Sequence, residues 1–213
     1  MPSTTILMTI GILICSLIVG ISFYYVINKS NRKEKKQQID QFLSYAINFI
    51  LFVWAGKVIL QLPLFFQDPL AVLAYPSDSR SVYIATILLI IQITYHILRK
   101  QLHILTMIET TIPIFIATVF MHEFLQLMIE GNRYGIPNLI LMTALLFLYL
   151  FLHDKQSIRS NTMGIITIFC FSHISFYIVY SYTTVFDYML HPMYFLSIFV
   201  LSVGLFLYDW QRN

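Results

Sequence analysis

Charge is scarce in this sequence of 213 residues. Only 11% of the residues are charged, whereas 58% are hydrophobic and the mean hydropathy is +0.76. A soluble globular domain carries about 25% charged residues, so the composition excludes a soluble fold. The net charge of +3 is modest, and five of the 13 cations fall between Lys29 and Lys36. This clustering is typical of membrane topology and gives no reason to expect nucleic acid as a partner.

Cysteine and the common catalytic motifs are also scarce. The two cysteines, Cys15 and Cys170, fall inside separate apolar runs, which provides neither a disulfide framework nor a CxxC metal site. The sequence contains no GxSxG elbow, no Walker loop and no pair of carboxylates at catalytic spacing. We therefore expect no metal site and no cofactor.

Long apolar runs predict an all-α membrane protein. A helix needs roughly 20 residues to cross the hydrocarbon core, and the sequence contains several runs of about that length. No internal repeat or linker interrupts them, so we predict one integral membrane domain over residues 1–213. The seven predicted transmembrane helices cover residues 5–27, 42–62, 82–98, 104–128, 139–152, 162–182 and 193–208.

The distribution of lysine and arginine predicts the orientation of these spans. Cytoplasmic loops retain basic residues, and ten cations fall on one side of the predicted bundle. Only Arg80 and Arg133 fall on the other side. The N-terminus is therefore predicted outside and the C-terminus inside, with the connection 63–81 lying along the outer interface.

Ionisable residues inside apolar runs are the first candidates for a functional site. Lys57 and Glu123 lie at similar predicted depths near the outer ends of their spans. Lys57 can extend its ammonium to the interface, or the two residues can form a buried ion pair. His122 precedes Glu123 and begins a stretch like the zinc-protease HExxH, but Gln126 replaces the second histidine, so no metal site is expected.

Two further ionisable residues are better explained by structure than by chemistry. Glu109 precedes Pro113 by four residues, where a proline is expected to kink the helix. A helix-end role is favoured for Glu109. His173 lies among serines and tyrosines that can satisfy its ring nitrogens, so we predict a core histidine rather than a ligand.

Five short segments occur in the same order as motifs of a known family. They are Ala55-Gly56-Lys57-Val58, Phe65-Phe66-Gln67-Asp68-Pro69, Glu109-Thr110-Thr111-Ile112-Pro113, Glu130-Gly131-Asn132-Arg133-Tyr134-Gly135-Ile136-Pro137 and Met193-Tyr194-Phe195-Leu196-Ser197. They resemble the prolipoprotein diacylglyceryl transferase family, seven-helix bacterial enzymes that move a diacylglyceryl group from phosphatidylglycerol to a lipoprotein cysteine. The resemblance implies a multi-pass protein of the bacterial plasma membrane. It also adds Arg133 and Tyr134 to the candidate lipid-site residues.

The differences from this family fall on its chemistry. The family's His-Gly-Gly aligns with Ile84-Ala85-Thr86, which contains no imidazole. The signature arginine aligns with Glu123 and the signature asparagine with Gln126. A carboxylate repels phosphate, whereas an arginine would hold it.

Three functions follow from these observations. The favoured hypothesis is a catalytically degenerate relative that binds a membrane phospholipid, a lipoprotein or a membrane-protein partner. The second is an active, divergent transferase that uses Lys57, His122 or Glu123 in place of the missing groups. The third is a small transporter, although only the span with Pro113 is visibly interrupted.

Overall fold

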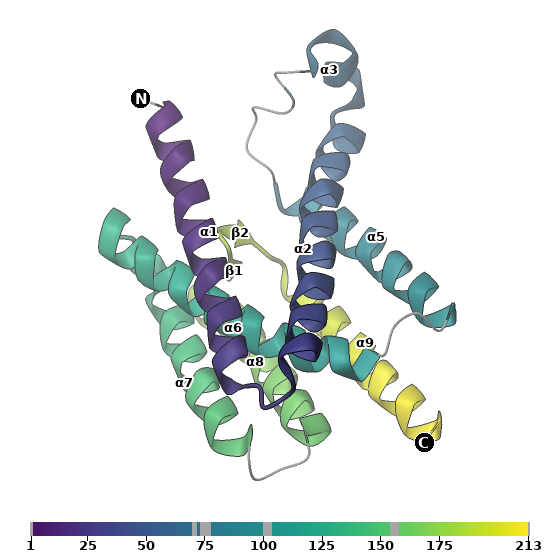
Figure 1. Cartoon of the computed structure of the whole chain (residues 1–213). Helices are drawn as coiled ribbons and strands as arrows, with labels where there is room; N and C mark the ends of the chain where they lie inside the picture. The colour runs from purple at the N-terminus through teal and green to yellow at the C-terminus, as the bar shows by residue number, and fades with distance from the viewer. Residues whose placement is uncertain (1, 70–71, 73–77, 100–103, 154–157, 213) are drawn as a thin grey trace. The chain divides into compact units, whose positions relative to one another are not determined.

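Helices dominate the fold (Figure 1). A computed structural model of the chain describes residues 2–69, 72, 78–99, 104–153 and 158–212. The α-helices are α1 (Pro2–Ile27), α2 (Arg32–Leu60), α3 (Leu62–Gln67), α5 (Ser79–Leu98), α6 (Ile104–Glu130), α7 (Ile136–His153), α8 (Ile158–Tyr180) and α9 (Pro192–Arg212). A 3-10 helix, η1 (Arg133–Gly135), precedes α7, and an antiparallel hairpin of β1 (Thr184–Val185) and β2 (Tyr188–Met189) precedes α9.

Six of the described helices are long and apolar enough to cross a membrane, namely α1, α2, α5, α6, α7 and α8. Helix α9 adds a shorter apolar stretch, Pro192–Gly204. Large apolar side chains are exposed on the helix surfaces, for example Val26, Ile91 and Ile178. Apolar helix surfaces of this kind are stable in contact with lipid chains and not with water. The chain is therefore an all-α, multi-pass membrane protein with one small hairpin.

The chain divides into two compact units. Residues Arg32–Met107 form one unit, and Met1–Asn31 with Ile108–Asn213 form the other. In the Arg32–Met107 unit, α2 packs against α5, where Gly56 lies so close to Ser81 that an added Cβ would be 3.0 Å from the Ser81 carbonyl oxygen. Near the other end of this helix pair, the Tyr45 hydroxyl lies 2.8 Å from Nδ1 of His96.

In the second unit, α1 packs closely against α6. A Cβ added to Gly20 would lie 2.1 Å from the Thr118 hydroxyl and 2.6 Å from the Ile114 carbonyl oxygen, so only glycine allows this approach. Small residues at helix contacts are typical of membrane bundles. The Tyr24 hydroxyl forms a 3.1 Å hydrogen bond with Thr110 of α6. Helix α6 is the most buried of the six apolar helices.

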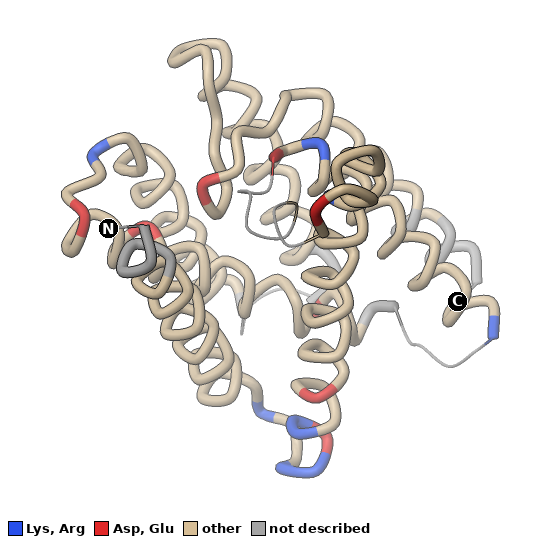
Figure 2. The backbone as a smooth tube through the Cα atoms, turned by 90° about the horizontal axis from the view of Figure 1, so that it is seen from above, with Lys and Arg blue, Asp and Glu red and all other residues tan. Residues whose placement is uncertain are grey.

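The structure corrects several details of the sequence prediction. Helix α2 begins at Arg32, ten residues before the predicted span, because lysine, glutamate and glutamine favour a helix outside the apolar stretch as well. Figure 2 shows this basic stretch where α1 ends and α2 begins. Helix α6 runs through Pro113, as the predicted span 104–128 requires, and ends at Glu130. Within the predicted connection 63–81, α3 forms a short helix, and residues 70–71 and 73–77 lie outside the described residues.

The hairpin is the element that the prediction missed. The sixth span was predicted to reach residue 182, but α8 ends at Tyr180 and Ser181 adopts a left-handed conformation with φ of 61°. A helix cannot continue through such a residue. The chain then turns into β1, and the hairpin contacts α6 through Phe186 and Asp187 and α7 through the Thr184 carbonyl.

Candidate functional site

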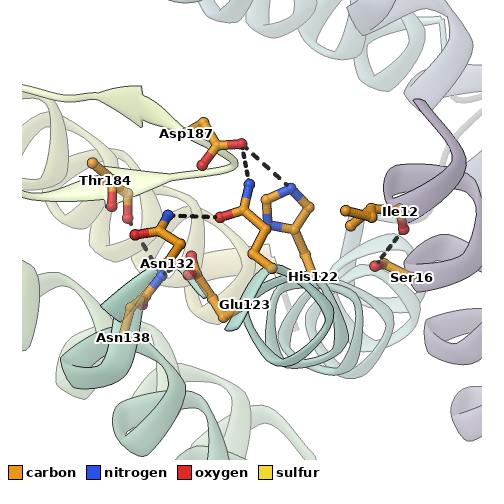
Figure 3. Close-up of polar contacts among 9 residues, drawn as sticks. Ile12, Ser16, His122, Glu123, Asn132, Asn138, Thr184 and Asp187 are labelled. Atoms are coloured by element: carbon orange, nitrogen blue, oxygen red, sulfur yellow. Dashed lines mark hydrogen bonds and ion pairs between the residues drawn. The ribbon is translucent and has the colours of Figure 1, made fainter. Parts of the chain in front are cut away.

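Seven polar residues gather beside the C-terminal end of α6 (Figure 3). We call them the polar cluster: His122, Glu123, Gln126, Asn132, Asn138, Thr184 and Asp187. Helix α6 contributes three of them, the loop before η1 and helix α7 one each, and the hairpin two. All belong to the same unit of the chain.

Helical spacing explains why α6 can contact two neighbours at once. His122 and Gln126 are four residues apart and share one face of the helix, whereas Glu123 lies about 100° around the axis. The first face meets Asp187 at the hairpin turn. Glu123 meets Asn138 of α7. One turn of α6 therefore positions both the hairpin and α7.

The hairpin turn has an unusual backbone. Phe186 and Asp187 form the two-residue loop, with φ values of 50° and 65°. Positive φ is usual in such turns but favours glycine or asparagine. The side chains offset this strain. Phe186 packs edge-on against His122 with the ring centroids 5.2 Å apart, and Asp187 accepts a hydrogen bond from Gln126.

A directed series of hydrogen bonds connects η1 to the hairpin. The backbone N–H of Tyr134 donates to Oδ1 of Asn132 at 3.1 Å, so the Asn132 amide nitrogen must point away. That nitrogen donates to Oε1 of Gln126 at 3.1 Å. Nε2 of Gln126 then donates to Asp187. The backbone donor therefore fixes the orientation of the Asn132 amide and, through it, that of the Gln126 amide. The series ends at the Asp187 carboxylate because a carboxylate can only accept.

His122 is almost completely buried, at 1% exposed. Its Nε2 lies 3.7 Å from the carboxylate of Asp187, which is too long for a hydrogen bond but within ion-pair range if the ring is protonated. Among the described residues, Nδ1 has no hydrogen-bond partner. The Asp187 side chain is 49% exposed, so the pair lies between the core and the surface of this unit.

Glu123 is held as a buried acceptor. It is 4% exposed, and its Oε1 accepts a 2.8 Å hydrogen bond from the Asn138 side-chain amide. Its Oε2 lies over Gly135, where an added Cβ would come within 2.1 Å of the oxygen. Glycine at position 135 therefore leaves space for the carboxylate. The ion pair predicted between Glu123 and Lys57 stays a prediction, because Lys57 lies in the other unit.

The structure brings together three of the predicted site residues: His122, Glu123 and Gln126. Arg133 and Tyr134 lie next to this group in η1 and are exposed. Lys57 is buried in α2.

Glu109 and His173, the other ionisable candidates, lie elsewhere on the helices. Glu109 is half-buried on α6, and its neighbour Thr110 bonds to α1. His173 is a core residue as predicted, but its Nδ1 contacts the Phe169 carbonyl at 3.0 Å rather than a serine or tyrosine hydroxyl.

Sequence reasoning missed four members of the polar cluster: Asn132, Asn138, Thr184 and Asp187. None of them is an ionisable group inside a predicted span, and the candidates were selected as ionisable groups inside spans. The available signal was their position near the predicted ends of the fourth, fifth and sixth spans. Polar residues at three span ends can meet when those ends lie on the same side of the membrane.

The polar cluster is rich in acceptors. Two carboxylates, the Asn138 amide oxygen and the Thr184 carbonyl line it, and within the described residues no group of three His, Cys, Asp or Glu could hold a metal ion. This arrangement can accept hydrogen bonds or hold a cation.

No protein-family model, curated protein or solved structure matches the chain.

Replacing Asp187 with glycine tests whether this carboxylate organises the site. Asp187→Gly relieves the positive φ but removes the acceptor for Gln126, so we expect a net loss of about 1 kcal/mol in the free energy of unfolding. Ser181→Gly is the matched control, since it relieves a similar φ of 61°. Thermal unfolding in detergent should show a lower midpoint for Asp187→Gly and an unchanged or higher midpoint for Ser181→Gly. Equal increases in both variants would contradict the role of Asp187.

Proposed function

We propose that this chain is a bacterial plasma-membrane protein, divergent from prolipoprotein diacylglyceryl transferase, that binds a membrane phospholipid without catalysing the transfer. A lipoprotein or a membrane-protein partner is the other ligand class compatible with such a site. The proposal includes seven transmembrane helices with the N-terminus outside. In that orientation the polar cluster faces the outer leaflet, where α6 ends and α7 begins.

The observation that carries the proposal is the state of Glu123. The transferase resemblance puts the phosphate-holding arginine at this position, and phosphate binding calls for a cationic donor. Glu123 instead is buried and bonded to Asn138, and Gln126 is engaged with Asp187. These residues serve as acceptors and as structural links. We therefore infer the helical scaffold of the family with a site that accepts hydrogen bonds, where the family has an arginine that holds phosphate.

An active transferase is the second candidate, and one observation favours it. His122 is an imidazole beside the Asp187 carboxylate, a pair that can accept a proton in many enzymes. The ring would have to replace the missing family histidine. The His122 side chain is only 1% exposed, however, which favours a structural role for it.

Complementation decides between these two functions. We expect that the chain, expressed in a strain depleted of its own diacylglyceryl transferase, fails to restore lipid modification of a reporter lipoprotein. An authentic transferase expressed at the same level is the positive control, and an epitope tag confirms membrane insertion. Mass spectrometry of the reporter measures the modification. A diacylglyceryl-modified cysteine on the reporter would overturn the non-catalytic assignment.

Cysteine accessibility tests the proposed orientation. In a background of Cys15→Ser and Cys170→Ala, Ser30→Cys should react with a membrane-impermeant maleimide only after the cells are opened. Ser79→Cys should react in intact cells. The expectation follows from the excess of basic residues on the Ser30 side. The reverse pattern at both positions would show that the polar cluster faces the cytoplasm.

A further inference from the structure

Three cations near the start of α2 lie on the side of the helix that is turned away from α5. Arg32, Lys33 and Lys36 are all exposed, and an α-helix turns by about 100° per residue, so they fall within about 100° of one another. We call them the basic face. Tyr45 and Gly56, which approach α5, lie roughly opposite Lys36 around the helix axis. Figure 2 shows the basic residues at this end of α2.

The same side of α2 becomes apolar farther along the helix. Three of its large side chains, Ile50, Leu51 and Trp54, are exposed. Each follows one of the three cations by 18 residues, and 18 residues make about five full turns of an α-helix. Apolar side chains exposed on a transmembrane helix contact lipid chains. The basic face therefore stands in line with a lipid-facing apolar column. The aligned pairs are Arg32 with Ile50, Lys33 with Leu51 and Lys36 with Trp54.

The spacing between the basic face and the apolar column fits one phospholipid molecule. Ile47 is exposed on the same side of α2 and follows Lys36 by 11 residues, which corresponds to about 16 Å along the helix. The hydrocarbon of one leaflet is about 15 Å thick, half of the bilayer core. Acyl chains that pack along Ile47 and Ile50 therefore place the phosphate at the level of Lys36.

The basic face carries positive charge that its own helix does not neutralise. Lys36 is three residues from Lys33 and four from Arg32, and like charges at these spacings repel one another. Asp40, four residues after Lys36, supplies one negative charge. Glu34 has no basic residue three or four positions away in the sequence, and it lies about 100° around the axis from Lys33. An excess of positive charge remains for an external anion.

We propose that the basic face and the apolar column together bind one anionic phospholipid. Its phosphate accepts charge-assisted hydrogen bonds from the three cations, and its acyl chains pack along the exposed apolar side chains of α2. Basic clusters directly beside a transmembrane helix attract anionic lipids in this way. Membrane topology alone requires basic residues on one side of the membrane, but it does not require them to be in register with a lipid-facing column.

The inference goes beyond the proposed function. The basic face belongs to the Arg32–Met107 unit, whereas the polar cluster belongs to the other unit. The two sites also differ in chemistry, because the basic face donates hydrogen bonds and the polar cluster accepts them.

Lipid titration of the full chain tests the headgroup. The protein in detergent is titrated with phosphatidylglycerol or phosphatidylcholine of the same acyl chains, and native mass spectrometry measures bound lipid. We expect phosphatidylglycerol to bind at least fivefold more tightly. Raising the salt to about 0.5 M should reduce this preference to less than twofold, because salt screens exposed charges. Free glycerol phosphate forms a further arm and should not bind at concentrations that saturate the protein with phosphatidylglycerol.

Charge substitutions tie the preference to the basic face. Arg32→Gln combined with Lys36→Gln should weaken phosphatidylglycerol binding at least fivefold and leave phosphatidylcholine binding unchanged. Glutamine is a good helix former, so α2 should keep its start. Arg80→Gln combined with Arg99→Gln is the matched control, because it removes the same charge from exposed positions of α5 and its C-terminal cap. The control should bind phosphatidylglycerol as the unchanged protein does.

The possible failures are distinguishable. Equal binding of the two lipids, a preference that persists at high salt, or normal phosphatidylglycerol binding by the Arg32 and Lys36 double variant would each overturn the basic face as a lipid site. Glycerol phosphate that binds as tightly as phosphatidylglycerol would show that the ligand is a soluble phosphate and not a lipid. In all these cases the proposed function stands. If the folded protein binds neither lipid, both the lipid site on α2 and the proposed phospholipid-binding function are wrong.

Discussion

The hydrogen bond from Asn138 to Glu123 is the interaction on which the arrangement of this unit depends. A carboxylate buried at the end of a membrane helix is tolerated only with donors that satisfy it. Asn138 provides one, and the same amide lies beside the Thr184 carbonyl. Helix α6, helix α7 and the hairpin, whose Thr184 lies 46 residues beyond Asn138 in the sequence, therefore meet at one side chain. The space for the carboxylate comes from Gly135, the last residue of η1 directly before α7.

This constraint also determines what the site can recognise. With its nitrogen facing two acceptors, the Asn138 amide is fixed in one orientation, and the carboxylates of Glu123 and Asp187 make the polar cluster negative. Such a site repels phosphate and attracts a cationic donor.

The membrane helices could be predicted from the sequence because hydropathy reports lipid contact directly. The start of α2 could not, because polar helix formers continue a helix beyond the membrane without any apolar signal. His122, Glu123 and Gln126 were found because ionisable or motif-like residues stand out in an apolar run. Asp187 was missed because its role arises from a hairpin whose turn residues, Phe186 and Asp187, lack the glycine or asparagine that marks such turns.

A double-mutant cycle between Glu123 and Asn138 tests the central interaction most directly. Glu123→Leu leaves the Asn138 amide without its carboxylate, and Asn138→Leu leaves a buried carboxylate without its donor, so each should lower the free energy of unfolding by about 1–3 kcal/mol. The double variant should be destabilised by at least about 1 kcal/mol less than the sum of the two single variants. Chemical unfolding in mixed micelles provides the three differences. Additive effects of the two substitutions would contradict the account.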